Sequence, residues 1–299
     1  MNHPVDSPDL VAVPATPPPA LSPGTRTALR AAVVIVAVLL LLGGIGGLAA
    51  AAVGVGNIRV VADTQPLPAT MRSLTLDTTA APMAVRIKPD PDAREPRVEV
   101  RLVNGRGAEE RSLDITSGPD ADTRITVRGS APDWMKWARA GELTVVVPPQ
   151  LGRRLTVTTE QELGVLEVDA DLDRLVARSS SGAVILRGSA RSVQAEVRHG
   201  AVIADAPILV REAFSANVTE GDISVDFRGV APRTVEVSSS DGDVTLGLPG
   251  DGPYLVSATS GPDYDAAVVR VPQTTNRDEA ESVVTARASG GDVVIDGVD

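Results

Sequence analysis

Hydrophobic residues follow two different patterns along this chain. From Ala31 to Val55, 25 consecutive residues carry no charge and no strongly polar side chain. As an α-helix, such a run is about 37 Å long, which is enough to cross a bilayer. A soluble helix of this length normally has a polar face, and this run has none. The pattern therefore predicts one transmembrane helix at residues 31–55, with the lipid bilayer as its partner.

The residues before this helix indicate its orientation. Arg26 and Arg30 precede it directly, so the positive-inside rule places the N-terminus in the cytoplasm and the C-terminal domain outside. Residues 1–30 contain several prolines and are expected to form a disordered cytoplasmic tail. A cleaved signal peptide is the competing interpretation, because Ala49 to Ala52 are small enough for signal peptidase. The long leading segment and the long apolar run favour a retained anchor.

After a linker expected at 56–69, apolar residues alternate with polar ones in short runs. Turn residues such as Asn104-Gly105 separate these runs, and the combination is typical of β-strands. The pattern predicts an all-β extracytoplasmic domain at 70–299. Its first strands are expected near residues 74–77, 85–87, 98–102, 113–115, 125–127 and 143–147.

From residue 155 onward the chain repeats itself, with a period of roughly 20 residues. Each repeat centres on a glycine, with apolar residues seven and five positions before it and two and four positions after it, as in Leu175, Ala177, Val184 and Leu186 around Gly182. Gly261, followed by Pro262, breaks this pattern. The other glycines of the series are interpreted as structural turn residues: Gly164, Gly182, Gly200, Gly221, Gly242 and Gly291.

Each repeat is interpreted as a strand, a tight turn that needs glycine, and a second strand. A unit this short cannot bury its own apolar face, so neighbouring units must stack around one shared interior. The sequence therefore predicts a β-solenoid, preceded by one transmembrane α-helix.

Composition narrows the classes of function. The chain contains 28 basic and 39 acidic side chains and no cysteine. Without cysteine there is no disulfide, no cysteine-ligated metal and no thiol nucleophile. A net charge of −11 argues against nucleic acid as a partner, since phosphate binding needs clustered lysine and arginine. No cofactor motif and no small-molecule substrate are identified, and the chain is predicted not to be an enzyme.

Three residues are candidates for chemistry. His199 is the one histidine outside the tail, and its place beside Gly200 favours a surface turn over a Ser-His-Asp site. Asp222 and Asp243 each follow a turn glycine one repeat apart, so stacking is expected to bring their carboxylates about 5 Å from each other. That distance suits a retaining glycosidase, but no aromatic platform for sugar flanks the pair. They remain weak candidates for calcium binding, against a solvated acidic row.

The domain resembles the bacterial "putative adhesin" domains of unknown function. The resemblance covers about residues 70–299 and depends on RSLTLDT at 72–78, ELTVVVPPQLGRRLTVTT at 142–159, and a repeated S-[SD]-G-[AD]-V-x-[LI] turn. That turn occurs at Ser180–Leu186, Ser240–Leu246 and Ser289–Ile295. The resemblance implies a membrane-anchored β-solenoid of the cell envelope and transfers no catalytic residue.

Two functions are compatible with these features. The first is a non-enzymatic, adhesin-like module that contacts an envelope or cell-surface component. The second is a signalling component that senses the envelope while its proline-rich tail recruits a cytoplasmic partner. The tail has no recognisable output motif, so the first function is favoured.

Overall fold

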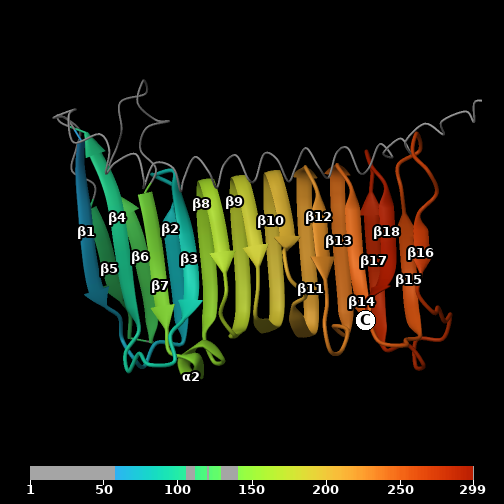
Figure 1. Ribbon diagram of the computed structural model, residues 1–299, viewed down its shortest axis with the longest axis horizontal. Coiled ribbons are helices and arrows are strands. Elements are labelled where there is room, and N and C mark those ends of the chain that lie inside the picture. The colour runs from blue at the N-terminus through green and yellow to red at the C-terminus, as the bar shows by residue number, and fades with distance from the viewer. Residues whose placement is uncertain (1–57, 106–111, 120, 129–140, 299) are drawn as a thin grey trace, which may run out of the picture.

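The computed structural model describes residues 58–105, 112–119, 121–128 and 141–298, and they form an all-β protein (Figure 1). One short helix, α2 (Pro149–Gly152), accompanies the strands. The strands are β1 (Ile58–Pro66), β2 (Ser73–Thr78), β3 (Met83–Pro89), β4 (Arg97–Gly105), β5 (Ser112–Ser117), β6 (Asp122–Arg128), β7 (Gly141–Val147), β8 (Thr156–Val168), β9 (Leu172–Leu186), β10 (Ser189–Ala204), β11 (Leu209–Glu220), β12 (Ile223–Asp226), β13 (Thr234–Asp241), β14 (Val244–Pro249), β15 (Tyr254–Thr259), β16 (Val268–Arg270), β17 (Ser282–Ala288) and β18 (Val293–Val298).

The expected tail at 1–30 and transmembrane helix at 31–55 lie outside the described residues. Among the residues that are described, no helix is both long and apolar enough to cross a membrane. The linker expected at 56–69 differs from the structure, because Ile58–Pro66 forms strand β1. This strand pairs antiparallel with β4 from Ile58–Gly105 to Pro66–Arg97, which covers backbone groups that would otherwise form an open edge.

The strands form two rows, which we call stack A and stack B. The order in stack A is β5, β6, β2, β8, β9, β10, β11, β13, β17 and β15. In stack B it is β1, β4, β7, β3, β8, β9, β10, β12, β14, β18 and β16. The long strands β8, β9 and β10 bend at a glycine and contribute to both stacks. Neighbouring strands are parallel, except for the pairs β1–β4, β4–β7 and β5–β6.

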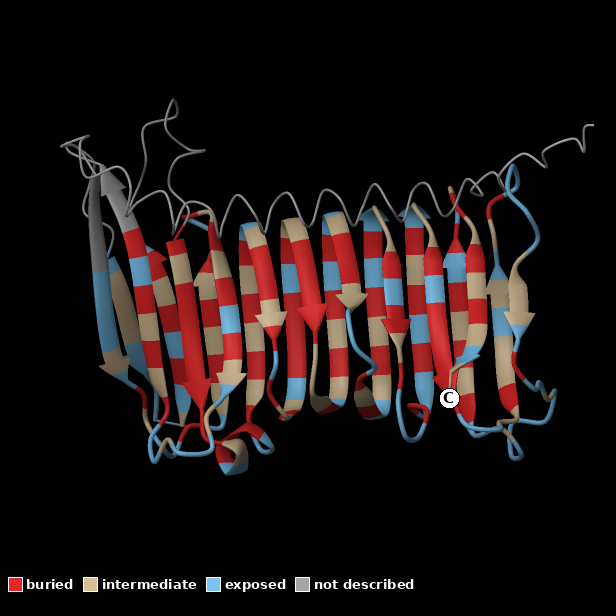
Figure 2. Ribbon diagram, viewed as in Figure 1, coloured by how far each residue is buried: buried red, intermediate tan, exposed pale blue. Residues whose placement is uncertain are grey.

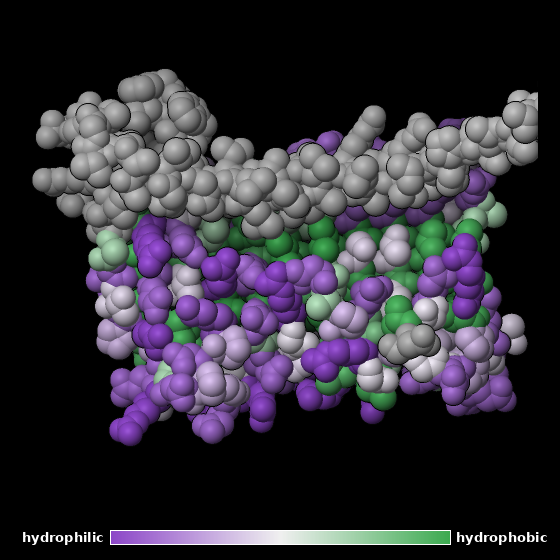
Figure 3. Space-filling view, viewed as in Figure 1, coloured by the Kyte–Doolittle hydropathy of each residue, from purple (hydrophilic) through white to green (hydrophobic). Residues whose placement is uncertain are grey.

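The core lies between the two stacks and is built from rows of equivalent apolar residues (Figure 2). One row in stack A consists of Val157, Leu175, Val193, Phe214, Val235 and Val284, all 5% exposed or less. In stack B, the corresponding row consists of Leu166, Val184, Val202, Ile223, Val244 and Val293, all 1% exposed or less. Hydrophilic side chains cover much of the outer face seen in Figure 3. The alternation read from the sequence thus corresponds to inward and outward positions.

The turn glycines lie in contact with one another at the bends. A Cβ atom added to Gly200 would lie 1.7 Å from the carbonyl oxygen of Gly182, and one added to Gly291 would lie 2.2 Å from that of Gly242. The φ angle of Gly200 is +145°, a region that side-chain-bearing residues rarely adopt. These positions therefore require glycine for two reasons: the backbones of neighbouring turns lie too close for a Cβ atom, and the backbone conformation is one that other residues rarely adopt.

The last two strands do not follow the order of the sequence. Strands β17 and β18 lie between the β13–β14 unit and the β15–β16 unit, and they pair in parallel with both. As a result Gly291 contacts Gly242, whereas Gly261 lies on the far side of β17 and β18. Gly261 breaks the sequence pattern because it belongs to the terminal unit of the row.

Replacing Gly200 by alanine is expected to destabilise the domain severely. The new Cβ must displace a neighbouring backbone, so we expect a loss of more than about 3 kcal/mol in the free energy of unfolding. Gly250 is the matched control, because its φ is +80° but an added Cβ has no atom within 4 Å. There the change to alanine should cost about 1 kcal/mol. Equal losses for the two variants in urea unfolding would contradict close contact at the bend.

Candidate functional site

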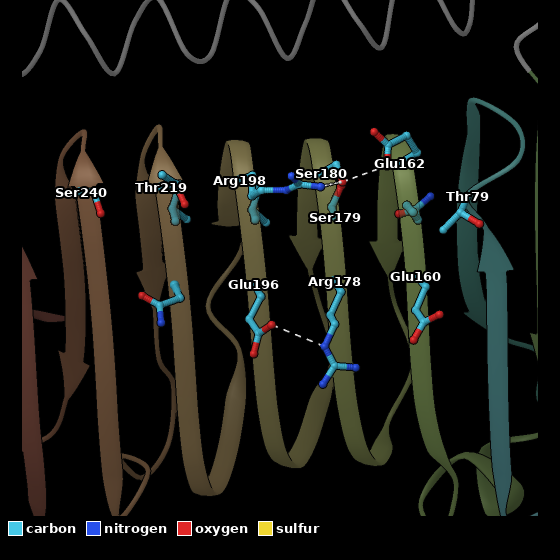
Figure 4. Close-up of a pocket in the computed structure, with 14 residues that line it drawn as sticks. Thr79, Glu160, Glu162, Arg178, Ser179, Ser180, Glu196, Arg198, Thr219 and Ser240 are labelled. Carbon is cyan, nitrogen blue, oxygen red and sulfur yellow. Dashed lines mark hydrogen bonds and ion pairs between the residues drawn. The ribbon is translucent and has the colours of Figure 1, made fainter.

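A polar groove crosses the outer side of stack A, close to the bends (Figure 4). Its volume is about 610 Å³, and it extends across β8, β9, β10, β11 and β13. The lining residues come from equivalent positions of successive strands, because the strands are parallel and in register. Most of these residues are charged or carry a hydroxyl or amide group: Thr79, Glu160, Glu162, Arg178, Ser179, Ser180, Glu196, Arg198, Asn217, Thr219 and Ser240.

Two rows of charged residues run along the groove. In the first row, Arg178 lies between Glu160 and Glu196 in the register, and its Nε is 3.4 Å from Oε2 of Glu196. In the second row, the Ser180 hydroxyl donates to Glu162 over 3.0 Å and accepts from Arg198 over 2.6 Å. The side chains of Arg178 and Glu196 are 48% and 47% exposed. Ion pairs this exposed add little to the free energy of folding. Breaking them therefore costs little, and the charged groups can turn toward a ligand.

The floor of the groove is buried and its polar groups are satisfied. Ser179 is 7% exposed, and its hydroxyl donates to the carbonyl oxygen of Ser181 over 3.2 Å. Gln161 is 4% exposed and donates to the carbonyl oxygen of Met83 over 3.5 Å. A packed floor with exposed charged groups above it is suited to binding a polar surface or polymer.

His199 lies at the edge of this region, beside the bend. Its Nδ1 is 3.2 Å from the carbonyl oxygen of Ser180, and its Nε2 is 3.6 Å from Oε1 of Glu220. The side chains of His199 and Glu220 are 55% and 61% exposed. The histidine's contacts are thus a backbone carbonyl and a glutamate on the surface, in the position expected for a turn histidine.

On the other side of the bends, three aspartates form a ladder. The residues that follow Asp222, Asp243 and Asp292 pair with one another across β12, β14 and β18. The register therefore places the three aspartates side by side. Oδ1 of Asp222 accepts the backbone N–H of Asp243 over 2.9 Å, and Oδ1 of Asp243 accepts that of Asp292 over 2.9 Å. The first two carboxylates therefore each bind the backbone of the next strand.

The ladder ends at Asp292, whose Oδ1 is buried without a hydrogen-bond partner in the described part of the chain. Burial, followed by the charges of Asp243 and Asp265, raises the pKa of Asp292, while the backbone N–H of Asp265 acts in the opposite direction. Burial also raises the pKa of Asp243, with a further contribution from Asp222, while the N–H of Asp292 acts in the opposite direction.

The calcium candidates Asp222 and Asp243 are adjacent in this ladder, where both hold backbone groups. Within the described ranges, no three or more histidine, aspartate or glutamate side chains are grouped so that they could hold a metal ion. The observed contacts of Asp222 and Asp243 are thus those of turn residues that bind neighbouring backbone.

The sequence contained signals for features that pattern reading missed. Asp292 follows Gly291 as Asp222 follows Gly221, so the Gly-Asp pair marked a third member of the ladder. The groove was marked by Glu160, Arg178 and Glu196, which alternate in charge at intervals of one repeat. A charge alternation at the repeat length places opposite charges side by side on neighbouring parallel strands.

Comparison with known proteins adds structural neighbours. No family model matches the chain, and no curated protein is similar to it. A "putative adhesin" of Bacteroides fragilis is similar with a TM-score of 0.41 and 10% identity, covering 80% of this chain and 97% of that one. A "putative adhesin" of Parabacteroides merdae has a TM-score of 0.43 and 11% identity, with coverages of 81% and 97%. A "putative lipid binding protein" of Parabacteroides distasonis has a TM-score of 0.40 and 10% identity, with coverages of 82% and 98%.

Replacing Asp243 by asparagine is expected to stabilise the domain at neutral pH. A raised pKa means that ionised Asp243 costs stability above that pKa, and the cost disappears as the pH falls toward the ordinary value of 3.8. The amide oxygen of asparagine still accepts the N–H of Asp292. The melting temperature at pH 7 should therefore rise by a few degrees, and the difference should vanish near pH 4.

Asp243→Ala is the control for the hydrogen bond, because it removes both the charge and the acceptor. It should cost about 1 kcal/mol at pH 7. If the asparagine variant is instead as unstable as the alanine variant, the negative charge itself stabilises the turn.

Proposed function

We propose that this chain is a non-enzymatic, membrane-anchored interaction module of the cell envelope, with an adhesin-like β-solenoid outside the membrane. The observation that carries the proposal is the groove on stack A, where polar side chains occupy equivalent positions of five successive strands. A binding surface of this kind suits an extended polymer or another surface, since each contact can be repeated along the row.

The parallel register supports the solenoid. From β8 to β14 the chain alternates between the stacks, and equivalent residues of successive units are aligned at the bends and in both core rows. Each unit contacts mainly its neighbours, which is the arrangement expected of a repeat protein. Such a scaffold holds surface groups at fixed intervals.

The electrostatics support binding rather than catalysis. Catalytic groups usually combine a perturbed pKa with a position in a cleft. In the described part of the chain, the carboxylates with a raised pKa are Asp243 and Asp292, which lie outside the groove and bind or adjoin backbone groups of the scaffold. The groove instead presents arginine, glutamate and hydroxyl groups whose roles are those of hydrogen-bonding contacts.

The membrane anchor is proposed from the sequence. Residues 31–55 supply the apolar span, Arg26 and Arg30 favour a cytoplasmic N-terminus, and the domain from residue 70 would then face the outside. The structure begins its first described strand at Ile58, so the span and the folded domain are separated by only a few residues.

Cysteine labelling tests the topology, because the chain contains no cysteine of its own. A cysteine at Ser240, which is exposed, should react with a membrane-impermeant maleimide in intact cells. A cysteine at Ser7 should react only after the cells are permeabilised. The opposite labelling pattern would show that the domain faces the cytoplasm.

An adhesion assay tests the role of the groove. Cells expressing the full chain should aggregate or attach to surfaces more than cells without it, and the double variant Arg178→Glu, Arg198→Glu should lose at least half of this gain. Arg211→Glu with Arg233→Glu is the matched control, since both arginines are exposed and lie outside the groove. The proposal fails if the wild-type chain adds no adhesion, or if both double variants lose it equally at equal surface levels.

A further inference from the structure

The row of strands ends at β15 and β16, and this end is open. In the described part of the chain, β15 pairs with β17 alone apart from one bridge between Tyr254 and Gln273, and β16 pairs with β18 alone. Figure 1 places these two strands at one extreme of the molecule. The opposite extreme differs, since β1, β4 and β5 form antiparallel pairs there.

The backbone of β15 directs unpaired groups outward. The N–H of Tyr254 donates to the carbonyl oxygen of Pro272 over 2.9 Å, and its C=O accepts from the N–H of Thr274 over 2.8 Å. Groups of alternate residues in a strand point to the same side, so Val256 and Ala258 direct their N–H and C=O groups the same way. The segment that covers Tyr254 pairs with neither of them. Two residues of the edge are therefore ready to pair with another strand.

The side chains of these two residues extend the apolar core to the open end. Val256 and Ala258 align with Val284 and Ala286, which are fully buried. Val256 and Ala258 are only partly buried and pack against the core, since they are the last in their rows. An additional strand would bury them while extending the two rows by one step.

The loops around this end are acidic. Between residues 250 and 281 there are six acidic side chains and two arginines, and one of these, Arg270, already pairs with Asp296 over 3.0 Å. The acidic residues are Asp251, Asp263, Asp265, Asp278, Glu279 and Glu281, and all are exposed. The same end of a second copy would bring like charges together, whereas a basic segment would neutralise them.

We propose that this open end binds an extended, basic peptide segment of a partner protein by parallel strand addition to β15. Backbone hydrogen bonds to Val256 and Ala258 supply the pairing, and lysine or arginine on the flanks of the segment contacts the acidic loops. The inference builds on the proposed interaction module and names a partner class for a surface distinct from the groove.

The rows of stack A specify the apolar positions of such a segment. Several strands of stack A place a larger apolar residue in one row and alanine two residues later, as in Val193 and Ala195, Phe214 and Ala216, and Val284 and Ala286. Strand β13 instead has Val235 and Val237 in these rows. The bound strand should carry a larger apolar residue and alanine opposite Val256 and Ala258. A suitable probe is the peptide Lys-Thr-Val-Thr-Ala-Thr-Lys.

Binding of this peptide to the full-length chain in detergent tests the proposal. We expect saturable binding by fluorescence anisotropy, at least ten-fold weaker binding when both lysines are replaced by glutamate, and slower hydrogen exchange at the amides of Val256 and Ala258 when the peptide is present. Methylation of the peptide's backbone nitrogens should abolish binding, because it leaves the side chains but removes the donors.

Two substitutions with the same charge provide the protein control. Val256→Lys places a charge in the core row and should weaken binding at least ten-fold, whereas Ser257→Lys changes an exposed side chain and should leave most of the affinity. The proposal is overturned if the basic peptide does not bind, if the methylated peptide binds equally well, or if the two variants behave alike. The two proposals can fail separately. If the groove variant Arg178→Glu, Arg198→Glu loses adhesion but still binds the peptide, the groove and the open end act independently. If the peptide does not bind while the groove variant still loses adhesion, this inference fails and the proposed function stands.

Discussion

The close contact between glycines at the bends is the constraint on which the rest of the structure depends. Beside most bend glycines the space is filled by the carbonyl oxygen of the neighbouring bend glycine, as at Gly182 and Gly200, and beside Gly164 by that of Met83. Because these backbones touch, successive strands are held in one register on both sides of the bend. That register aligns the core rows, the charged rows of the groove and the aspartate ladder, so each surface pattern follows from the bend.

Register also explains how charges are arranged on the surface. Arg191 of β10 contacts Asp173 of β9 and Glu212 of β11, with distances of 2.8 Å to both. Each partner lies one repeat away along the chain, so the ion pairs run across strands instead of along them. Exposed pairs of this kind add little stability one by one. Their larger effect is to disfavour a slip by one residue, which would reverse the face of every side chain.

Much of the fold was predictable from the sequence, because inward residues recur at fixed distances from the glycines. The pattern around Gly182 or Gly221 shows both the alternation of the two strands and the bend between them. The all-β prediction is confirmed. The prediction was weaker at the two ends of the row. Strand β1 lies where a linker was expected, and β17 and β18 lie between β13–β14 and β15–β16 instead of at the end. Such rearrangements depend on pairing between distant segments, and a local pattern contains no information about them. The groove was predictable only once Glu160, Arg178 and Glu196 were known to be neighbours.

The position of β17 and β18 has a consequence for the end of the row. Had the units been stacked in sequence order, the regular Gly291 unit would have been terminal, and the carboxylate of Asp292 would have lain at the open end of the row. Placing β15 and β16 outside puts the irregular turn at Gly261 beyond Asp292, and in the described part of the chain no hydrogen bond reaches Oδ1 of Asp292. In stack A, the backbone groups of Val256 and Ala258 remain unpaired in the described part of the chain. The terminal unit thus ends the aspartate ladder on the stack B side of the bend and leaves the edge of β15 open to a further strand in stack A.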